Sequence, residues 1–413
     1  MNRVKLKDIA YYSEERINTS LITKKRYIST DNMLAQKGGI IEASNLPNSK
    51  TVLKCEIGDT LISNIRPYFK KIYLADSVYG VSSDVLIIKT QDESLVDKRF
   101  LYYTLSRDYF FKYVMVSAKG SKMPRGDKDM IMNFEINLPD LPTQVKIADL
   151  LSSLDDKIEI NNKINQELEE LGQALYTKWF VNFDFPNEEG KPYKSSGGEM
   201  IESELGMIPK GWKVGAIGDG VITKIIGSGI NKFESTKKYL ATANVSISSI
   251  INHEKISYSN RPSRANMQPK SNTVWFAKMK DTKKILSISD FDSDIIDEYI
   301  FSTGFAGVEC LNDSIYYVWN FINNEKFELT KNSLSNGSTQ KSINNENISK
   351  IKMIIPTNEL LTSYYNLMYN SMKQISLNKL ENKKLEELRD FLIPQLMSGN
   401  LEIKDIDNTE KEV

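Results

Sequence analysis

Cysteine, histidine and long apolar runs are scarce in this 413-residue chain, and each scarcity excludes a class of protein. Cys55 and Cys310 are too few for a disulfide framework or a zinc site, so we expect both to be small buried residues in a reducing cytoplasm. No apolar run reaches the length of a membrane span, and the opening MNRVKLKDIAYY lacks the apolar core of a signal peptide. The sequence therefore predicts a cytoplasmic protein with no membrane partner and no bound metal.

Catalytic motifs are missing as well. HExxH, CxxC and GxxxxGK(S/T) do not occur, and the short glycine clusters GDG and GSG do not assemble into GxGxxG. The single histidine, His253, has no second candidate ligand beside it in the sequence. FDFP at residues 183–186 lacks the Asn/Asp-Pro-Pro core that adenine methyltransferases use. These absences predict a protein without catalytic residues and without a directly bound cofactor.

Charge is balanced over the whole chain, with 54 basic and 54 acidic residues, but it is divided unevenly. Residues 1–141 hold 22 Lys and Arg against 17 Asp and Glu, and residues 208–355 hold 19 against 14. Residues 142–185 hold only 4 against 8. An acidic segment that separates two mildly basic blocks suits a protein whose blocks face phosphates while the segment stands away from them.

The longest helical pattern runs from Gln144 to Phe180, where apolar residues recur at helical spacing without an intervening proline. Roughly 37 helical residues span about 55 Å, so such a helix needs a partner outside a small domain. Leu360–Gly399 supplies one, because it repeats LEEL with an offset of 217 residues, which is 31 heptads. We predict an antiparallel coiled coil, with asparagines fixing its register. The predicted pairing positions are Leu151, Leu154, Ile158, Asn161, Asn165, Leu168, Leu175, Ile375, Asn378, Asn382, Leu385 and Leu392.

The segments that precede the two helices also repeat each other. The pairs match in the same order: Lys24–Met33 with Lys237–Val245, Gly58–Ala75 with Ser271–Ile288, and Phe134–Pro139 with Ile351–Pro356. The predicted fold is α+β, with two β-rich mixed globular domains joined by two long antiparallel coiled-coil helices in a pseudo-two-fold internal repeat. The predicted boundaries are 1–141 (first head), 142–185 (first helix), 186–207 (linker), 208–355 (second head), 356–400 (second helix) and 401–413 (tail).

Basic loops at matching positions in the two heads are the candidates for nucleic-acid contact. Ser117–Asp129 places four basic residues in a loop with Gly and Pro, whereas its equivalent, Leu334–Asn347, has one Lys among Asn, Gln, Ser and Thr. Because Arg pairs with guanine and Asn or Gln with adenine, we expect the two heads to read different bases. The candidates are Arg66, Lys70, Lys71, Lys119, Lys122, Arg125 and Lys128 in the first head, and Arg261, Arg264, Lys278, Lys280, Gln340 and Lys341 in the second.

Three further stretches carry a family resemblance. They are NLPDLPTQ at the start of the first helix, SELGMIPKGWKV at residues 203–214, and KLEELRDFLIPQLMSG at residues 384–399. With these motifs, and with the order head, helix, linker, head, helix, the chain resembles the specificity subunit of type I restriction-modification systems over essentially its whole length. Two departures are visible: PTQV lacks the usual Glu before its Gln, and Glu359 replaces the second Pro in the second copy.

The resemblance implies that each head is a target recognition domain reading one half of a bipartite, asymmetric double-stranded DNA site. It implies that the helices set the spacer between the half-sites and dock two modification subunits, which carry S-adenosylmethionine and methylate adenine. Two restriction subunits, with ATP and Mg²⁺, would complete the complex. On this interpretation the chain is a non-catalytic specificity subunit that binds no cofactor itself.

The residues alone leave a second hypothesis open, that of a coiled-coil interaction scaffold whose heads bind protein or carbohydrate. Aromatic-lined heads without basic loops would favour that hypothesis. Loops rich in Lys, Arg and Asn at matching positions of both heads favour DNA.

Overall fold

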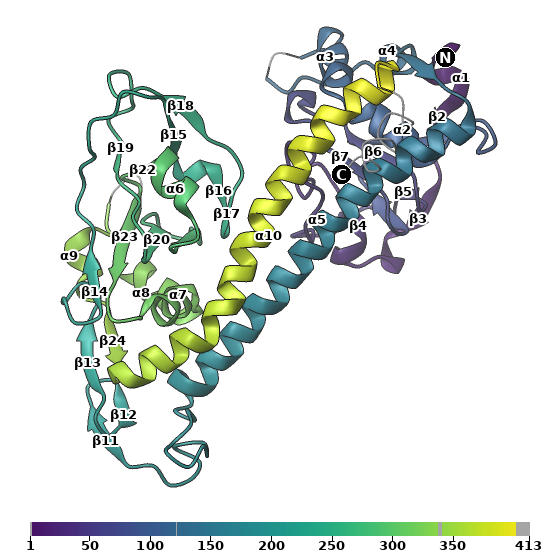
Figure 1. Ribbon diagram of the computed structural model, residues 1–413. Helices are drawn as coiled ribbons and strands as arrows, with labels where there is room; N and C mark the ends of the chain where they lie inside the picture. The colour runs from purple at the N-terminus through teal and green to yellow at the C-terminus, as the bar shows by residue number, and fades with distance from the viewer. Residues whose placement is uncertain (1, 121, 338–340, 402–413) are drawn as a thin grey trace, which may run out of the picture. The chain divides into compact units, whose positions relative to one another are not determined.

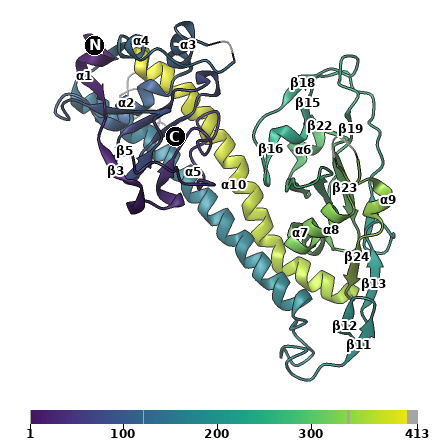
Figure 2. The ribbon, with the colours of Figure 1, turned by 180° about the vertical axis from the view of Figure 1, so that it is seen from behind.

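The computed structural model describes residues 2–120, 122–337 and 341–401, and the chain divides into two compact units. The first unit consists of Met1–Ile160 with Glu381–Val413, and the second of Asn161–Leu380. Each unit contains strands, short helices and part of two long helices, α5 (Leu141–Tyr176) and α10 (Asn358–Ser398) (Figures 1 and 2). We call the strands and short helices of each unit its head.

Strands form most of the first head. They are β1 (Asn2–Lys5), β2 (Ala10–Tyr12), β3 (Arg16–Asn18), β4 (Tyr27–Ile28), β5 (Thr51–Cys55), β6 (Thr60–Ser63), β7 (Ile72–Leu74), β8 (Tyr79–Val81), β9 (Val85–Thr90) and β10 (Glu135–Leu138). Within the described residues, one sheet has the order β2-β9-β6-β7 and a second has the order β3-β5-β8-β4, in which β4 and β8 are parallel. β1 pairs with β10, so the beginning and end of the head meet in one antiparallel ladder.

Short helices cover the sheets of the first head, namely α1 (Leu6–Ile9), α2 (Lys98–Leu105), α3 (Asp108–Val116) and α4 (Lys128–Met132). Asp97 begins α2 by accepting a hydrogen bond from Phe100 N, and Asp127 begins α4 in the same way. Phe110, Phe111 and Phe134 pack in the core between these helices and the first sheet. Burying each such ring contributes roughly 1.5–3 kcal/mol relative to leaving it exposed.

The long helices are anchored to the first head at one end of each. Leu151 of α5 and Leu392 of α10 share a buried cluster with Phe100 and Tyr103 of α2. Gln144 is fully buried at the start of α5, where its amide Oε1 accepts from Asp97 N and its Nε2 donates to the carbonyls of Leu95 and Pro139. The glutamine of the PTQ motif therefore fixes the start of the long helix to the start of α2.

The second head has its own set of strands. They are β11 (Met200–Ser203), β12 (Gly206–Pro209), β13 (Lys213–Ala216), β14 (Thr223–Ile225), β15 (Lys237–Leu240), β16 (Val245–Ser246), β17 (Ser249–Ile250), β18 (Glu254–Ile256), β19 (Ala265–Met267), β20 (Thr273–Ala277), β21 (Ile285–Ile288), β22 (Tyr299–Ser302), β23 (Phe305–Cys310) and β24 (Lys352–Ile355). Where the structure describes this unit, its larger sheets have the orders β14-β23-β20-β21 and β18-β15-β22-β19. The pairs β11·β12, β13·β24 and β16·β17 form two-stranded ladders.

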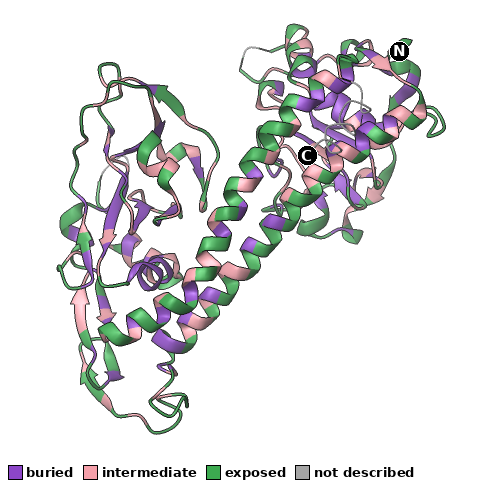
Figure 3. Cartoon of the chain, in the orientation of Figure 1, coloured by how far each residue is buried: buried purple, intermediate pink, exposed green. Residues whose placement is uncertain are grey.

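The helices of the second head are α6 (Ser293–Glu298), α7 (Ile315–Asn323), α8 (Glu325–Ser333) and α9 (Asn345–Ile348). Aromatic rings join the turn after α5 to α7 and α10: Phe180 lies 4.7 Å from Tyr317 and 4.9 Å from Tyr364 between ring centroids. The central strands β6, β9, β20 and β23 are almost wholly buried, whereas in Figure 3 α5 and α10 alternate between buried and exposed positions along their length.

The two heads repeat one topology. The hairpin β6·β7 corresponds to β20·β21, the parallel pair β4·β8 to β15·β22, and the closing ladder β1·β10 to β13·β24. Within each unit the long helices run antiparallel: Asp155 and Lys157 meet Arg389 and Glu381 in the first. The predicted α+β class, with two mixed heads and two long helices, is confirmed.

Details of the helix ends and of the linker differ from the sequence expectation. The first helix was expected to reach residue 185, but α5 ends at Tyr176 and a π-helical turn, Thr177–Val181, follows it. Phe183 then adopts a left-handed backbone conformation, which ends the helical run. Residues 186–207 were expected to be a linker, but β11 and the start of β12 lie within them and form an antiparallel ladder. α10 continues through Pro394, whose ring removes one backbone donor from the last two turns.

Candidate nucleic-acid interface

In the first head, the loop Ser117–Asp129 is held by backbone hydrogen bonds against the end of β6. We call this arrangement the loop frame. Its bonds, from N–H to carbonyl, are Asn64 to Asp84 (2.9 Å), Arg66 to Pro124 (2.8 Å), Gly126 to Asn64 (3.3 Å), and Lys119 and Arg125 to each other (2.9 Å both ways). Three segments far apart in sequence are thereby fixed beside one another, so Lys119 and Arg125 are presented from a defined backbone.

Two basic side chains of the loop are paired with carboxylates. Arg125 Nη2 donates to Asp84 Oδ1 at 3.0 Å, and Lys119 Nζ donates to Asp127 Oδ2 at 2.9 Å. The bond from Lys119 lowers the pKa of Asp127. Arg125 nevertheless keeps 55% of its side chain exposed and Lys119 83%, so both are available to an anionic ligand. Asp84 was not anticipated from the sequence, because it lies 41 residues from Arg125.

The turn after β6 places two more candidates in left-handed backbone conformations. Arg66 and Lys70 have φ of 50° and 51° and flank the short 3₁₀ helix Pro67–Phe69. Non-glycine residues in that region cost of order 1 kcal/mol or more, and such strain gathers at functional sites. Arg66 Nε is buried and has no hydrogen-bond partner among the described residues. Lys70 Nζ is 2.8 Å from Asp108 Oδ2.

Lys71 is held differently from its neighbours. Its Nζ donates to the carbonyl of Thr30 at 2.6 Å, and burial lowers its pKa. The matching residue of the second head, Lys284, donates to the carbonyl of Thr242 at the same distance. Equivalent lysines, Lys71 and Lys284, therefore hold the equivalent turn in each head by the same hydrogen bond. Lys128, at the start of α4, lies over the ring of Tyr12 at 5.8 Å.

The second head repeats the loop frame with different residues. Its bonds are Lys278 to Gly304 (2.9 Å), Lys280 to Lys341 (2.9 Å), Ile343 to Lys278 (3.0 Å), and Asn336 and Ser342 to each other (3.1 and 3.0 Å). Ser342 thus occupies the position of Arg125, Gly304 that of Asp84, and Lys278 that of Asn64. The same backbone carries two different sets of side chains.

The candidates of the second head lie on and beside this frame. Lys278 is half-buried, makes no side-chain hydrogen bond or ion pair with a described residue, and has its pKa lowered by burial. Lys280 is half-buried and Lys341 is exposed, while Gln340 lies outside the described residues. The carbonyl of Arg264 accepts from Thr303 N at 2.9 Å, next to Gly304, and the Arg261 guanidinium stacks 3.9 Å over the ring of Tyr258.

The predicted pairing positions of the long helices are all at least half-buried. Leu151, Asn161, Asn165, Ile375, Asn378, Asn382 and Leu392 are buried, and Leu154, Ile158, Leu168, Leu175 and Leu385 are intermediate. In the second unit Asn378 Nδ2 donates to Asn165 Oδ1 at 2.9 Å. Leu175 packs against the core of the second head. The pairing positions nearest the helix ends therefore also pack against the cores of the heads.

Other chemistry finds little support in the described residues. Cys55 and Cys310 are buried free thiols, as expected, and burial raises the pKa of Cys55 to about 12, so it is no nucleophile at neutral pH. No group of three His, Cys, Asp or Glu in the described part of the chain could hold a metal ion. None of the helices that the structure describes has the length and apolar character that crossing a membrane requires.

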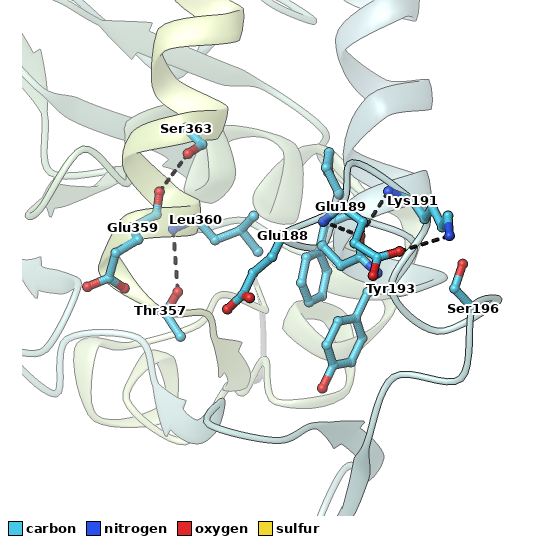
Figure 4. A pocket seen from close by; sticks show the side chains of 12 residues that line it. Glu188, Glu189, Lys191, Tyr193, Ser196, Thr357, Glu359, Leu360 and Ser363 are labelled. Carbon is cyan, nitrogen blue, oxygen red and sulfur yellow. Dashed lines mark hydrogen bonds and ion pairs between the residues drawn. The ribbon is translucent and has the colours of Figure 1, made fainter.

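A pocket of about 800 Å³ lies in the second unit between the segment after α5 and the start of α10 (Figure 4). Glu188, Glu189 and Lys191 line one side, and Glu359 and Ser363 line the other. Glu189 is paired with Lys191 at 2.8 Å, and the lining contains neither His nor Cys. The hydroxyl of Ser363 donates to the backbone carbonyl of Glu359, and that of Thr357 accepts from Leu360 N, so both bond to the first turn of α10.

Fold and site together define a class: a two-headed protein in which one loop frame is used twice with different side chains. A family model described as the type I restriction modification DNA specificity domain matches residues 1–170. The chain is 24% identical to the type I restriction enzyme HindI specificity subunit of Haemophilus influenzae, over 96% of this chain and 98% of that protein. It is 26% identical to the MjaIX specificity subunit of Methanocaldococcus jannaschii, over 75% and 71%.

Among solved structures, the S subunit of a type I restriction-modification system from M. genitalium matches 96% of each chain, with a TM-score of 0.54 and 14% identity. That likeness establishes the fold. Residues 1–170 thus match the DNA specificity domain of type I restriction-modification systems, and nearly the whole chain is similar to a specificity subunit of such a system.

Proposed function

We propose that this chain is the non-catalytic DNA specificity subunit of a type I restriction-modification complex, in which each head reads one half of a bipartite, asymmetric site. The observation that carries the proposal is the repeated loop frame. A reader of two unlike half-sites needs the same approach to DNA twice and different side chains at the point of contact. Arg125 and Lys119 of the first head are replaced by Ser342 and Asn336 in the second, on backbone that keeps the same hydrogen bonds.

We also propose that α5 and α10 dock two modification subunits and fix the spacer between the half-sites. Support comes from apolar side chains that the helices leave exposed at positions related by the internal repeat. Ile160 and Leu377 are 53% and 48% exposed, and Leu171 and Leu388 are 61% and 45% exposed. Exposed apolar side chains that recur at equivalent positions of the two helices suit the docking of two copies of one partner.

The remaining partners follow from the family. Two restriction subunits would join the complex, and S-adenosylmethionine, ATP and Mg²⁺ would be bound by the partner subunits. The chain itself contributes binding and orientation in this proposal, with no catalytic residue. Net neutrality of the chain is compatible with DNA binding, because the partners would share the phosphate contacts.

The decisive experiment is single-molecule methylome sequencing of a host that expresses this chain with its modification subunit. We expect N6-methyladenine in one motif made of two short half-sites separated by unspecified bases. Absence of any bipartite motif, with the complex shown to assemble, would overturn the proposal and favour the interaction scaffold.

The role of the helices as a spacer has its own test. Seven residues inserted into both α5 and α10, at positions that pair with each other, should lengthen the unspecified spacer while both half-sites stay the same. An insertion into α5 alone should misalign the pair and abolish methylation. An unchanged spacer in the doubly extended variant would contradict the role.

A further inference from the structure

The loop frames of the two heads differ in one correlated way. In the first head, Arg125 and Asp84 form an ion pair at 3.0 Å across the frame. In the second head, the residues at the same two backbone positions are Ser342 and Gly304. Both partners are therefore absent together, while the backbone hydrogen bonds that define the positions are retained. The second frame forms the same backbone hydrogen bonds without an ion pair, so the pair is not needed to hold the frame together. The Arg125–Asp84 pair therefore calls for another explanation.

The geometry of the pair leaves most of the Arg125 guanidinium free. A guanidinium has five N–H donors, and one hydrogen of Nη2 is used by Asp84 Oδ1. The other hydrogen of Nη2 and both of Nη1 remain, so an end-on pair of bonds to O6 and N7 of a guanine is still possible. Asp84 restricts the rotation of a long side chain that is 55% exposed, and so lowers the entropy lost when it meets a base.

A carboxylate at a DNA-facing surface carries a penalty. Asp84 is 38% exposed beside the loop and would repel phosphates, which opposes sequence-independent binding. A carboxylate at this position is useful if orienting Arg125 toward a base matters more than sequence-independent affinity for DNA. An isolated surface ion pair contributes only about 0–1 kcal/mol to stability, so stability gives little reason to retain it.

We propose that Arg125 is the guanine-reading side chain of the first head and that Asp84 is its positioning residue, a pair with no counterpart in the second head. The inference rests on the proposed function and deepens it. It assigns a required guanine to the half-site read by the first head. In the second head Ser342 stands at the position of Arg125, and its hydroxyl does not require a guanine at the corresponding position of the second half-site.

The test uses the full chain in complex with its modification subunits and DNA bearing the methylated motif found in the host. Each guanine of the motif is replaced in turn by 7-deazaguanine, which lacks the N7 acceptor, and affinity is measured by fluorescence anisotropy. One guanine of one half-site should lose about tenfold or more in affinity on replacement. In Arg125→Ala the same replacement should have no further effect.

Asp84→Ala should lower the preference for that guanine severalfold and, because a negative charge is removed, tighten binding to unrelated DNA. A merely structural role would not move these two quantities in opposite directions. In the Arg125→Ala background, Asp84→Ala should leave the guanine preference unchanged, because Asp84 acts through Arg125. Glu135→Ala, which breaks the exposed Arg3–Glu135 pair at 3.5 Å elsewhere in the same unit, is the matched control and should leave all values as in the unsubstituted complex.

Losses of guanine preference that simply add in the double variant would overturn the positioning role of Asp84. Absence of any guanine sensitive to 7-deaza replacement would overturn the reading role of Arg125, while selective binding to the bipartite motif would leave the proposed function standing. If the unsubstituted complex preferred no bipartite DNA at all, both proposals would fall together.

Discussion

The side-chain amide of Asn378 donates a 2.9 Å hydrogen bond from Nδ2 to Oδ1 of Asn165, across the antiparallel helices of the second unit. Both side chains are buried, at 3% and 6% exposure. Gln374 completes the arrangement by donating to Asn378 Oδ1 at 2.7 Å. Buried amides tolerate few alternative registers, because a shift of one helix would leave them without partners among apolar side chains.

Asn165→Leu should therefore destabilise the chain by about 1–3 kcal/mol, since it leaves the Asn378 amide buried without its partner. The double variant Asn165→Leu, Asn378→Leu should recover most of that loss, because an apolar pair at the seam needs no hydrogen bond. Urea unfolding followed by circular dichroism measures both. A double variant as unstable as the sum of the single ones would show that the amides do not act as a pair.

A charged contact takes the corresponding role in the first unit. Arg389 Nη1 lies 2.5 Å from Asp155 Oδ1, and Tyr103 donates to Asp155 Oδ2 at 2.7 Å. Burial, the largest single influence, would lower the pKa of Arg389, but the charge and hydrogen bond of Asp155 together with the charge of Asp390 outweigh it, so the net shift is upward. Asp155→Asn should cost about 1–3 kcal/mol of stability, because a largely buried guanidinium loses the nearer of its two carboxylate partners. Asp155→Met with Arg389→Leu should be better tolerated in the same unfolding experiment.

The exposed apolar residues of the long helices predict the composition of the complex. Leu171→Ser combined with Leu388→Ser should leave the stability of the chain within about 0.5 kcal/mol, because both side chains are on the surface. The variant should bind fewer modification subunits, which native mass spectrometry of the assembled complex counts. Val116→Ser, at an 88% exposed position of the first head, is the control. Two bound modification subunits in the double variant would contradict docking at this surface.

Lys278 predicts a conflict between stability and binding. Burial holds its pKa below that of an unfolded lysine, so protonation is less favourable in the folded chain. At neutral pH the unfavourable contribution is fully present, and it diminishes as the pH rises through the folded pKa toward the unfolded value of about 10.4. Lys278→Met should therefore raise the melting temperature at pH 7, and the gain should shrink toward pH 10.

The same Lys278→Met variant should weaken binding to DNA in the half-site read by the second head, because a cation on the loop frame is lost. Anisotropy with the assembled complex and half-site mutants of the motif measures the effect. A stabilised variant with unaltered affinity for both half-sites would remove Lys278 from the interface.

Much of the fold follows from periodicity in the sequence. Helical spacing without prolines predicts α5 and α10, because an apolar stripe at 3.6-residue spacing has few other ways to be buried. The shared heptad phase of LEEL and of the asparagines predicts their pairing, since side chains on one helix face are related by sequence distance alone. Alternating residues in FEINLP and IKMIIP predict β10 and β24, and the repeat of both predicts two heads of one topology.

The site itself was decided by tertiary structure. Arg125 was visible in the sequence as a base in a glycine-containing loop, but Asp84 belongs to the turn before β9, and no periodicity relates the two. Sheet pairing brings them together, because Asn64 at the end of β6 binds the backbone of both segments. Likewise, Lys70 and Lys71 are neighbouring lysines that the sequence does not distinguish. Only the structure shows that Lys71 donates to the carbonyl of Thr30. Sequence distance determines neighbours along a helix or strand, whereas contacts between loops depend on how strands are ordered across a sheet.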